Sequence, residues 1–336
     1  MKILVTGGAG YIGSIATYLL LQKGHDVVVF DNFSTGHETA LKKFENEFPD
    51  KFKYYQADLK DKESLAKVFS SEKGIDAALH YAASCQVNES MEHPAMYFEN
   101  NVVGSLNLVD ALINNGIGKL VFSSTCAVYG DTQYVPVDEK HPTNPQSVYG
   151  ESKLMVEKII DWYGRLKGMD YVILRYFNVC GASDDGEVGD SKDPSVLLMQ
   201  NAVRGALDIQ SFKLTCAVVD TPDGTPIRDY INVVDLNEAH ISALEYLEGG
   251  GESEIINLGT GTGNSVLEIV EKVEEITNTK LPREKGEERK GEDTKIFADI
   301  TKAKEKLGWE PKRSIEDSVK SLVKWYKEHP NGWRSE

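Results

Sequence analysis

Short apolar runs alternate with segments of helical periodicity along the first half of the chain. The run Ile3–Val5 leads into a glycine-rich turn, and apolar residues then recur from Ile12 to Leu20 at intervals of three and four. Short apolar runs are typical of strands buried on both faces, and the longer period is typical of an amphipathic helix. The pattern therefore predicts a strand, a tight turn and a helix that ends near Gly24.

The same alternation continues to about residue 175. Further strands are predicted at Val27–Phe30, Phe52–Gln56, Ala77–Tyr81, Lys119–Ser123 and Tyr171–Arg175, and long helices at Pro94–Asn115 and Ser147–Lys167. Strands that alternate with helices predict an α/β fold with a Rossmann-type, doubly wound parallel sheet. Because ligands bind beyond the carboxyl ends of such strands, the expected site consists of Gly7–Gly13, Ala82–Ser84, Ser123–Thr125 and Tyr176–Asn178.

The length of the chain indicates more than one compact part. A chain of 336 residues exceeds the size at which a single core keeps growing. We predict a doubly wound domain at residues 1–177, joined by part of 229–262, and a smaller α/β domain at residues 178–336. In the smaller domain, Ser265 and Glu268 have the spacing of a capping box, which predicts a helix that begins at Val266.

The turn after the first strand has the features of a nucleotide-binding turn. Gly7, Gly10 and Gly13 follow a strand and open a helix, and Asp31 ends the second strand eighteen positions after Gly13 (31 − 13). In dinucleotide-binding units, such glycines let the backbone approach a pyrophosphate, and the acid accepts hydrogen bonds from a ribose. A purely structural turn is the alternative, because the G-x-x-G-x-x-G spacing differs from the usual fingerprint by one residue. The Asp31 carboxylate would repel a 2′-phosphate, which favours NAD over NADP.

Tyr149 and Lys153 lie four positions apart at the start of the second long helix. This spacing places both side chains on one helix face, where an ammonium stabilises a phenolate. A phenol that otherwise titrates near about 10 can then act as a base, although an exposed tyrosine over a lysine stem is the alternative. Ser123, Ser124 and Thr125 add hydroxyls where a strand ends, as an ordinary hydroxyl-rich turn also would. Together these residues favour a catalytic Ser/Thr, Tyr and Lys set.

Composition and charge exclude several classes of partner and site. Acidic residues outnumber basic ones by 53 to 37, and this net charge of −16 argues against nucleic acid or an anionic membrane surface as a partner. The four cysteines and seven histidines have neither the spacing of a zinc site nor that of a disulfide framework. The apolar run at Ile3 leaves no room for a signal peptide, and no 18-residue apolar stretch occurs, so we expect a cytoplasmic protein. The sequence also lacks the G-x-S-x-G motif of Ser-His-Asp hydrolases.

Several short motifs carry a resemblance to a known family. They are T-G-G-A-G-Y-I-G at 6–13, D-N at 31–32, A-D-L at 57–59, N-N-V at 101–103, S-S-T-C-A-V-Y-G at 123–130, Y-G-E-S-K at 149–153 and R-Y-F-N at 175–178. These motifs resemble those of the extended short-chain dehydrogenase/reductases. T-P-D-G-T-P-I-R-D-Y-I at 221–231 and N-L-G-T-G-T-G-N-S-V at 257–266 are similar to later motifs of the UDP-glucose 4-epimerases within that superfamily.

The resemblance implies reversible 4-epimerisation of UDP-glucose and UDP-galactose through a 4-keto intermediate, with NAD as a retained cofactor. It implies that Tyr149 takes the proton of the 4-hydroxyl, that Thr125 orients it, and that Lys153 lowers the pKa of Tyr149. It also implies that the first domain binds NAD and the second the UDP-sugar. The implied NAD-binding residues are Gly7, Gly10, Tyr11, Ile12, Gly13, Asp31, Asn32, Asp58, Leu59, Ala82, Ala83, Asn101, Ser123, Tyr149, Lys153 and Tyr176, and the implied substrate-binding residues are Thr125, Tyr149, Asn178, Arg228 and Arg289.

Some positions depart from the family pattern. Ile15 and Asn232 replace histidines, and Cys85 lies where some members carry a lysine. Ser195–Met199, which includes Leu197, and Leu214–Asp220 differ from the segments that the family places near the nucleotide sugar. These departures leave the predicted catalytic residues Thr125, Tyr149 and Lys153 unchanged. The sugar is therefore left open, and a 4-epimerase of UDP-N-acetylglucosamine, UDP-glucuronate or a UDP-pentose is the main alternative.

Single residues bear on the remaining alternatives. Ile296 lies where more restrictive members have Tyr, which suggests tolerance of N-acetylated sugars. Arg289 lies in a charged run and has a solvated loop residue as its alternative interpretation. Cys126 and Ala127 replace the acidic pair of the 4,6-dehydratases, which disfavours dehydration. Retention of the catalytic set argues against a silent NAD-binding sensor.

The resemblance finally implies a homodimer that pairs through the two long helices, Pro94–Asn115 and Ser147–Lys167. Val156, Ile159 and Ile160 offer an apolar face on the second of these helices. The same face would also serve to pack the helix on its own sheet.

Overall fold

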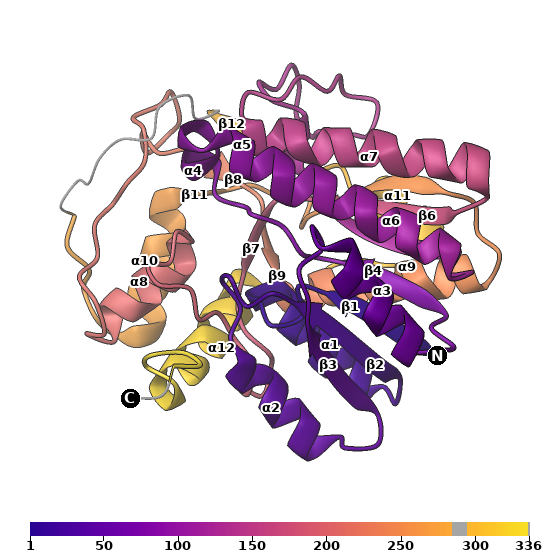
Figure 1. The fold of residues 1–336 in the computed structure, drawn as a ribbon. Helices are drawn as coiled ribbons and strands as arrows, with labels where there is room; N and C mark the ends of the chain where they lie inside the picture. The colour runs from indigo at the N-terminus through magenta and orange to yellow at the C-terminus, as the bar shows by residue number, and fades with distance from the viewer. Residues whose placement is uncertain (284–293, 335–336) are drawn as a thin grey trace. The chain divides into compact units, whose positions relative to one another are not determined.

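The computed structural model describes residues 1–283 and 294–334 (Figure 1), which form two compact units. Unit 1 comprises Met1–Asp131, Pro142–Arg175 and Ala239–Ile256. Unit 2 comprises Thr132–His141, Tyr176–Glu238 and Asn257–Glu336. Each unit is thus assembled from three separate stretches of the chain.

Strands and helices alternate through the first part of the chain. They are β1 (Lys2–Thr6), α1 (Tyr11–Gln22), β2 (Asp26–Asp31), α2 (Glu38–Glu47), β3 (Phe52–Gln56), α3 (Lys62–Ser71), β4 (Ala77–His80), α4 (Val87–Glu92), α5 (Pro94–Tyr97), the π-helical turn η1 (Phe98–Val103), α6 (Gly104–Asn114), β5 (Lys119–Thr125), the 3₁₀ turn η2 (Cys126–Val128), α7 (Val148–Lys167) and β6 (Asp170–Tyr176). With β10 (Glu254–Leu258), the strands form a seven-stranded sheet in the order β10-β6-β5-β4-β1-β2-β3. This order is that of a doubly wound sheet, so the predicted α/β fold class is confirmed.

The sheet reverses its direction of winding between β1 and β4. β1 pairs in parallel with β2 on one side and with β4 on the other. Ligands of doubly wound sheets bind beyond the carboxyl ends of strands at such a point. The segments that follow these two strands lie in direct contact, because a Cβ atom on Gly7 would lie 2.7 Å from the backbone nitrogen of Ala82. Gly7 also has a φ of +73°, so this turn requires glycine for two independent reasons.

A buried apolar core joins the sheet to the helices of unit 1. α6 contacts both α3 and α7, and Figure 1 shows α6 and α7 running side by side. The core between these helices and the sheet includes Leu4 and Phe122 from the strands, and Leu65, Leu108 and Ile160 from the helices. The 20-residue helix α7 begins at a Ser147 cap and ends at Gly168 in the left-handed conformation, which together fix its register.

Two predicted boundaries are wrong in detail. The helix predicted at Pro94–Asn115 is divided by η1, which carries Asn101, and a π-turn of this kind is common at functional sites. The strand predicted to end at Ser123 continues to Thr125, because Ser124 and Thr125 are also buried in extended conformation. Thr125 therefore lies at the last position of a strand rather than in the loop beyond it.

Unit 2 is built around small sheets and a group of helices. Its elements are β7 (Asn178–Cys180), α8 (Leu198–Ala206), β8 (Ile227–Arg228), β9 (Tyr230–Asn232), β11 (Asn264–Ser265), α10 (Val266–Thr277), β12 (Lys295–Ile296), α11 (Thr301–Leu307) and α12 (Ile315–Glu328), and α9 (Val233–Glu248) runs from unit 2 into unit 1. β8 lies between β11 and β12, β7 pairs with β9, and α10 packs on both α8 and α12. The capping box predicted at Ser265 and Glu268 is confirmed at the start of α10. Within the described part of the chain, no helix combines the length and the apolar character needed to span a bilayer.

Candidate active site

The predicted glycine turn connects β1 to α1 at the winding reversal. A Cβ on Gly13 would lie 2.2 Å from the carbonyl oxygen of Gly7, so the turn closes tightly over the first residues of the helix. Gly10 caps α1 without a side-chain hydrogen bond, and the first turn of α1, which is described throughout, contains no acidic residue. The positive end of the helix dipole is thus not neutralised by a carboxylate of that turn. This arrangement fits a pyrophosphate group of a dinucleotide.

A row of polar side chains continues from this turn across the ends of β2 and β3. Asp31 is the last residue of β2 and accepts hydrogen bonds from the backbone N–H groups of Ala9 (3.0 Å) and Phe33 (2.8 Å). Burial raises the pKa of Asp31, and these two hydrogen bonds oppose that shift. Asn32 donates to Asp58 over 3.2 Å, which joins the ends of the two strands. Carboxylate and amide oxygens at this place suit the hydroxyls of an adenosine ribose, so the residues present fit NAD.

Leu59 and Asn101 are positioned by the long helical region of unit 1. A Cβ on Gly104 would approach the Cβ of Leu59 to 3.2 Å, and the backbone oxygen of Leu59 accepts a hydrogen bond from Asn107. Asn101, in η1, accepts from the backbone N–H of Ser84 (2.8 Å) and donates to the backbone oxygen of Ser84 (2.9 Å). The π-turn thus holds Asn101 against the segment that follows β4.

Asn101 is also linked to the catalytic helix through a second hydrogen bond. Its amide nitrogen donates to the hydroxyl of Ser152 over 3.0 Å, and that hydroxyl donates to the carbonyl oxygen of Tyr149 over 2.7 Å. The backbone that carries Tyr149 is therefore connected to η1 by way of two buried side chains.

A buried histidine lies behind Asn101. His80 contacts the hydroxyl of Thr6 through Nδ1 (2.7 Å) and that of Ser105 through Nε2 (2.8 Å), and Ser105 donates onward to the carbonyl oxygen of Asn101. Burial lowers the pKa of His80 to about 3, so the ring is neutral at physiological pH. Since Ser105 uses its proton on Asn101, Nε2 of His80 carries the hydrogen and Nδ1 accepts from Thr6.

The hydroxyl residues of β5 have three different environments. Ser123 pairs with Nε2 of His240 over 2.8 Å, and Ser124 donates to Glu157 over 2.5 Å. Thr125 caps η2 by accepting from the backbone N–H of Ala127 over 3.1 Å. The row that sequence alone presents as three similar hydroxyls therefore has three different sets of partners, and only Thr125 lies at the end of the strand.

Tyr149 lies in the first turn of α7, and Lys153 lies one turn further along. A Cβ on Gly150 would lie 2.6 Å from the carbonyl oxygen of Ala127, so this turn packs directly on η2, two residues beyond Thr125. Lys153 is 3% exposed, and its Nζ lies 4.5 Å from the centre of the Phe122 ring. The expected catalytic set is thus held by two elements in backbone contact.

The charge state of Lys153 is set by opposing effects. Burial lowers the pKa of its ammonium to about 8, against the effects of Cys85 and Glu157, which act to raise it. The side chain therefore remains mostly charged near pH 7 but lies close to its titration range. A buried cation at this position stabilises negative charge that develops nearby during a reaction.

A buried ion pair connects the catalytic helix to two strands. Glu157, one turn beyond Lys153, accepts from Nε of Arg175 (3.0 Å) and from Nη2 of the same guanidinium (2.5 Å). The two side chains are only 3% and 5% exposed. With the bond from Ser124 on β5 and the contact of Arg175 with the Tyr129 ring (5.0 Å), this pair links β5, α7 and β6.

The expected substrate residues of unit 2 lie at the edges of its small sheets. Asn178 begins β7 and is exposed, and Tyr176, a predicted cofactor residue, is half-buried just before it. Arg228 ends β8, where its backbone is paired with Asn264 of β11 and Ile296 of β12. Arg289 lies outside the described residues.

Asp229 fixes the strand that presents Arg228. It is fully buried and accepts hydrogen bonds from the backbone N–H groups of Thr260 (2.7 Å), Gly261 (3.2 Å) and Ala298 (3.2 Å). Burial raises the pKa of Asp229, and these hydrogen bonds oppose the shift. Its position next to Arg228 suggests a supporting role for the neighbouring guanidinium.

The structure adds residues that sequence reasoning did not single out. They are Glu157, Arg175, His80, His240 and Asp229, each of which is buried and hydrogen-bonded beside a predicted site residue. A charged residue within an apolar-periodic helix is an available signal for Glu157, since Val156 and Ile160 flank it. No comparable signal marks His80 or His240, because a lone histidine is usually a core residue.

Comparisons with known proteins agree with this geometry. Residues 3–259 match the model of the NAD dependent epimerase/dehydratase family. The UDP-glucose 4-epimerase of Lactobacillus helveticus is 42% identical over 335 residues, which are 99% of this chain and 99% of that protein. A crystal structure of a UDP-glucose 4-epimerase is 41% identical, with a TM-score of 0.93 and full coverage of both chains.

A second structure comes from Bifidobacterium longum. That UDP-glucose 4-epimerase, in complex with NAD+ and UDP, is 34% identical with a TM-score of 0.93 and covers 99% of this chain and 100% of its own. The similarity therefore extends over both units, well beyond the nucleotide-binding turn. The chain belongs to the NAD dependent epimerase/dehydratase family.

Proposed function

We propose that this chain is an NAD-dependent UDP-glucose 4-epimerase, which interconverts UDP-glucose and UDP-galactose through a 4-keto intermediate. The observation that carries the proposal is the buried Lys153 ammonium, one helical turn beyond Tyr149, on a helix that packs directly against the segment after Thr125. The full-length relatives named above support the same reaction.

The residues of unit 1 supply the proton chemistry of this reaction. Tyr149 accepts the proton of the sugar's 4-hydroxyl as a general base and returns it as a general acid, and Thr125 orients that hydroxyl. Lys153 stabilises the phenolate form of Tyr149 through its positive charge. NAD, when bound, supplies a reversible hydride acceptor, so the cycle requires no net oxidant. Because the protein environment is fixed before the reaction begins, little reorganisation accompanies proton transfer.

The cofactor and the substrate are assigned to different parts of the chain. We assign NAD to the turn Gly7–Gly13, to Asp31, Asn32 and Asp58, and to the other predicted residues of 1–177. The nucleotide sugar is assigned to residues 178–336, where Arg228 suits paired diphosphate oxygens through its planar guanidinium. Asn178 and Arg289 complete the proposed substrate set.

The sugar specificity depends on a small residue at β12. Ile296 is buried and pairs in register with Arg228, and it occupies less volume than a tyrosine would. We therefore expect some turnover of UDP-N-acetylglucosamine beside UDP-glucose. The departures at Leu197, Leu214–Asp220 and Asn232 make UDP-glucuronate a further sugar to test.

The experiment is conversion of UDP-galactose to UDP-glucose by the purified protein without added NAD. Conversion is expected, together with release of NAD on denaturation. Tyr149→Phe should lower kcat by about 10²–10⁴-fold while it retains NAD, because only the general base is lost. Turnover of only UDP-N-acetylglucosamine or UDP-glucuronate would change the substrate assignment and leave the proposed mechanism in place. No turnover of any of the three sugars by NAD-containing protein would reject the proposal, and full activity of Tyr149→Phe would reject the mechanism.

We also propose that the enzyme is a cytoplasmic homodimer. Large apolar side chains are exposed along α4 to α7: Val87, Met91, Met96, Val103, Leu106, Met155, Trp162 and Leu166. Exposed apolar patches of this kind commonly mark protein interfaces, and a two-fold dimer would cover the same patch on both subunits. Cell fractionation tests the location.

A further inference from the structure

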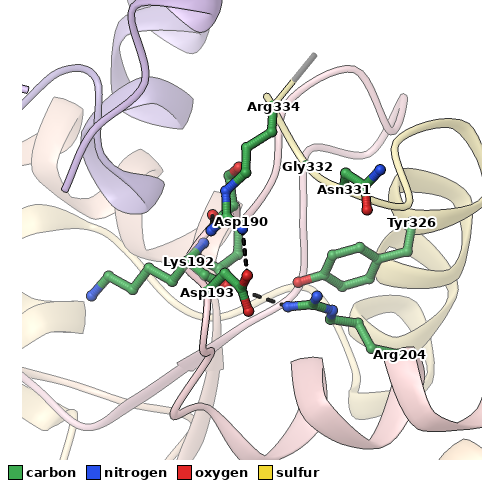
Figure 2. A pocket seen from close by; sticks show the side chains of 9 residues that line it. Asp190, Lys192, Asp193, Arg204, Tyr326, Asn331, Gly332 and Arg334 are labelled. Atoms are coloured by element: carbon green, nitrogen blue, oxygen red, sulfur yellow. Dashed lines mark hydrogen bonds and ion pairs between the residues drawn. The ribbon is translucent and has the colours of Figure 1, made fainter. Parts of the chain in front are cut away.

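Unit 2 contains a small polar cavity that the proposed reaction does not use. It has a volume of about 40 Å³ and is lined by residues before and within α8, by α12 and by the segment after α12 (Figure 2). The lining residues are Asp190, Ser191, Lys192, Asp193, Arg204, Tyr326, Asn331, Gly332 and Arg334.

Two of the lining side chains are deeply buried, and each has one polar atom without a hydrogen-bond partner. Arg204 is 9% exposed and its Nε has no partner, although Nη1 donates to the carbonyl oxygen of Lys192 over 3.3 Å. Tyr326 is 2% exposed and its hydroxyl has no partner. Figure 2 shows the Tyr326 hydroxyl pointing toward the Arg204 guanidinium at the cavity. Arg204 Nε can only donate and the Tyr326 hydroxyl can also donate, so one acceptor between them would satisfy both.

The same part of the chain contains further unpaired polar atoms. Among the described residues, the buried side-chain polar atoms without a partner all lie on α8, on α12 or just after it, and besides the two above they belong to Gln200, His329 and Trp333. Buried polar groups in folded proteins are normally paired. Of these residues, only Arg204 and Tyr326 line the cavity, so their unpaired atoms are the ones that point to a polar ligand there.

Charged side chains of both signs line the cavity. Arg204 and Arg334 carry positive charge there and Asp190 and Asp193 negative charge, and Asp193 already forms an ion pair with Arg334, while the Lys192 side chain points away from Arg204 and Tyr326 (Figure 2). Asp190 accepts from the backbone N–H of Lys192 and from the hydroxyl of Ser195, both over 3.2 Å. Burial raises the pKa of Asp190, and these hydrogen bonds oppose the shift. The Arg204 guanidinium thus retains a donor without a partner beside the cavity.

The size of the cavity restricts the ligand. A cavity needs about 10–15 Å³ to hold one water-sized atom, so a cavity of 40 Å³ accommodates about three such atoms. A carboxylate group consists of three heavy atoms and is the group that a guanidinium binds best. We propose that this cavity is a binding site for a small carboxylate, held by Nε of Arg204 and the hydroxyl of Tyr326.

The first test is thermal unfolding of the full-length, NAD-containing protein in increasing sodium formate at constant ionic strength. Binding to the native state alone should raise the Tm of the wild type by about 2 °C at ten times the dissociation constant. Tyr326→Phe and Arg204→Lys each remove one donor and should lose this rise. Tyr134→Phe removes an exposed hydroxyl elsewhere in unit 2 and should retain it. Equal Tm changes in the wild type and in both cavity variants would overturn the proposal.

A crystal structure of the wild-type protein in formate provides a test that does not depend on variants that fold. Planar three-atom density within hydrogen-bond distance of Arg204 Nε and the Tyr326 hydroxyl is expected. Separate water peaks in its place would overturn the carboxylate site and assign the unpaired donors to buried water. Epimerase activity is measured separately on each variant without formate. Failure of the carboxylate site is therefore distinguished from failure of the proposed epimerase function.

Discussion

Lys153 shows how one residue can be necessary for activity and costly for stability. The Phe122 ring lies 4.5 Å from its Nζ, and the Glu157 carboxylate that acts on it is already paired with Arg175. A buried cation without a full ionic partner opposes folding, because it loses its hydration. The proposed reaction requires that positive charge. Removing it should therefore increase the stability of the folded protein and decrease its activity.

We predict that Lys153→Met stabilises the NAD-free protein at pH 7, by at most about 3 kcal/mol, while it abolishes turnover. The pKa of Lys153 is about 8 in the folded chain and 10.5 in the reference state, so the unfolded chain binds more protons between these values. Wild-type stability should therefore rise relative to the variant from about pH 8 to 10.5, and the difference should no longer change with pH above that range.

Urea unfolding of both proteins across this pH range measures the effect. Lys67→Met, at an exposed position of α3, serves as the matched control and should show no pH-dependent difference. A Lys153→Met protein that is less stable than the wild type at pH 7 would show that the cation is well accommodated.

At the scale of elements, the Glu157–Arg175 pair determines how β5, α7 and β6 meet. Glu157→Gln should destabilise the protein by about 3–5 kcal/mol, because it leaves the Arg175 guanidinium buried without a counter-charge. It should also lower kcat, since the pair holds the helix that carries Tyr149 and Lys153.

The control for this substitution is an ion pair at the surface. Glu38 pairs with Lys42 on α2, where the two side chains are 45% and 58% exposed. Glu38→Gln should change stability far less than Glu157→Gln, because solvent screens an exposed ion pair. Chemical denaturation distinguishes the two cases, and similar losses for both variants would contradict a special role of the buried pair.

The contact between α7 and η2 leads to a second prediction at this scale. Gly150→Ala places a Cβ 2.6 Å from the carbonyl oxygen of Ala127, so α7 must move away from the segment after Thr125. A displacement of about 1 Å between reacting groups can lower kcat by about 10²-fold. Gly118→Ala, where the nearest atom to the new Cβ would be the carbonyl oxygen of Gly168 at 4.0 Å, should leave kcat unchanged. Steady-state kinetics of both variants with UDP-galactose measures the effect. An unchanged kcat in Gly150→Ala would show that α7 and η2 can move apart without displacing the catalytic groups.

At the scale of the whole molecule, the exposed apolar side chains of α4 to α7 bear on assembly. Trp162 and Leu166 are 56% and 69% exposed on α7. We predict that the double substitution Trp162→Glu and Leu166→Glu converts a dimer into a monomer, because buried like charges would face each other across a two-fold interface. Val218→Glu, at a site of unit 2 that is 65% exposed, should leave the dimer intact. Sedimentation velocity separates the two outcomes, and a monomeric wild type would remove the proposal.

Local patterns in the sequence determine the strands, the helices and most of the catalytic chemistry. Buried parallel strands are continuous apolar runs, so β1 to β6 can be read from the chain, and the capping box of α10 is visible in Ser265 and Glu268. Tyr149 and Lys153 are recognisable because four positions in a helix define one face. These signals depend only on neighbours within one element.

Only the tertiary structure decides how distant residues support that chemistry. The π-turn at Asn101, the burial of Lys153 and the bonds from Ser124 and Arg175 to Glu157 each join segments far apart in the chain. The cavity at Arg204 and Tyr326 likewise arises from α8 and α12, which are separated by more than a hundred residues. Burial and hydrogen-bond partners are properties of the packed chain, so a pattern of single residues cannot specify them.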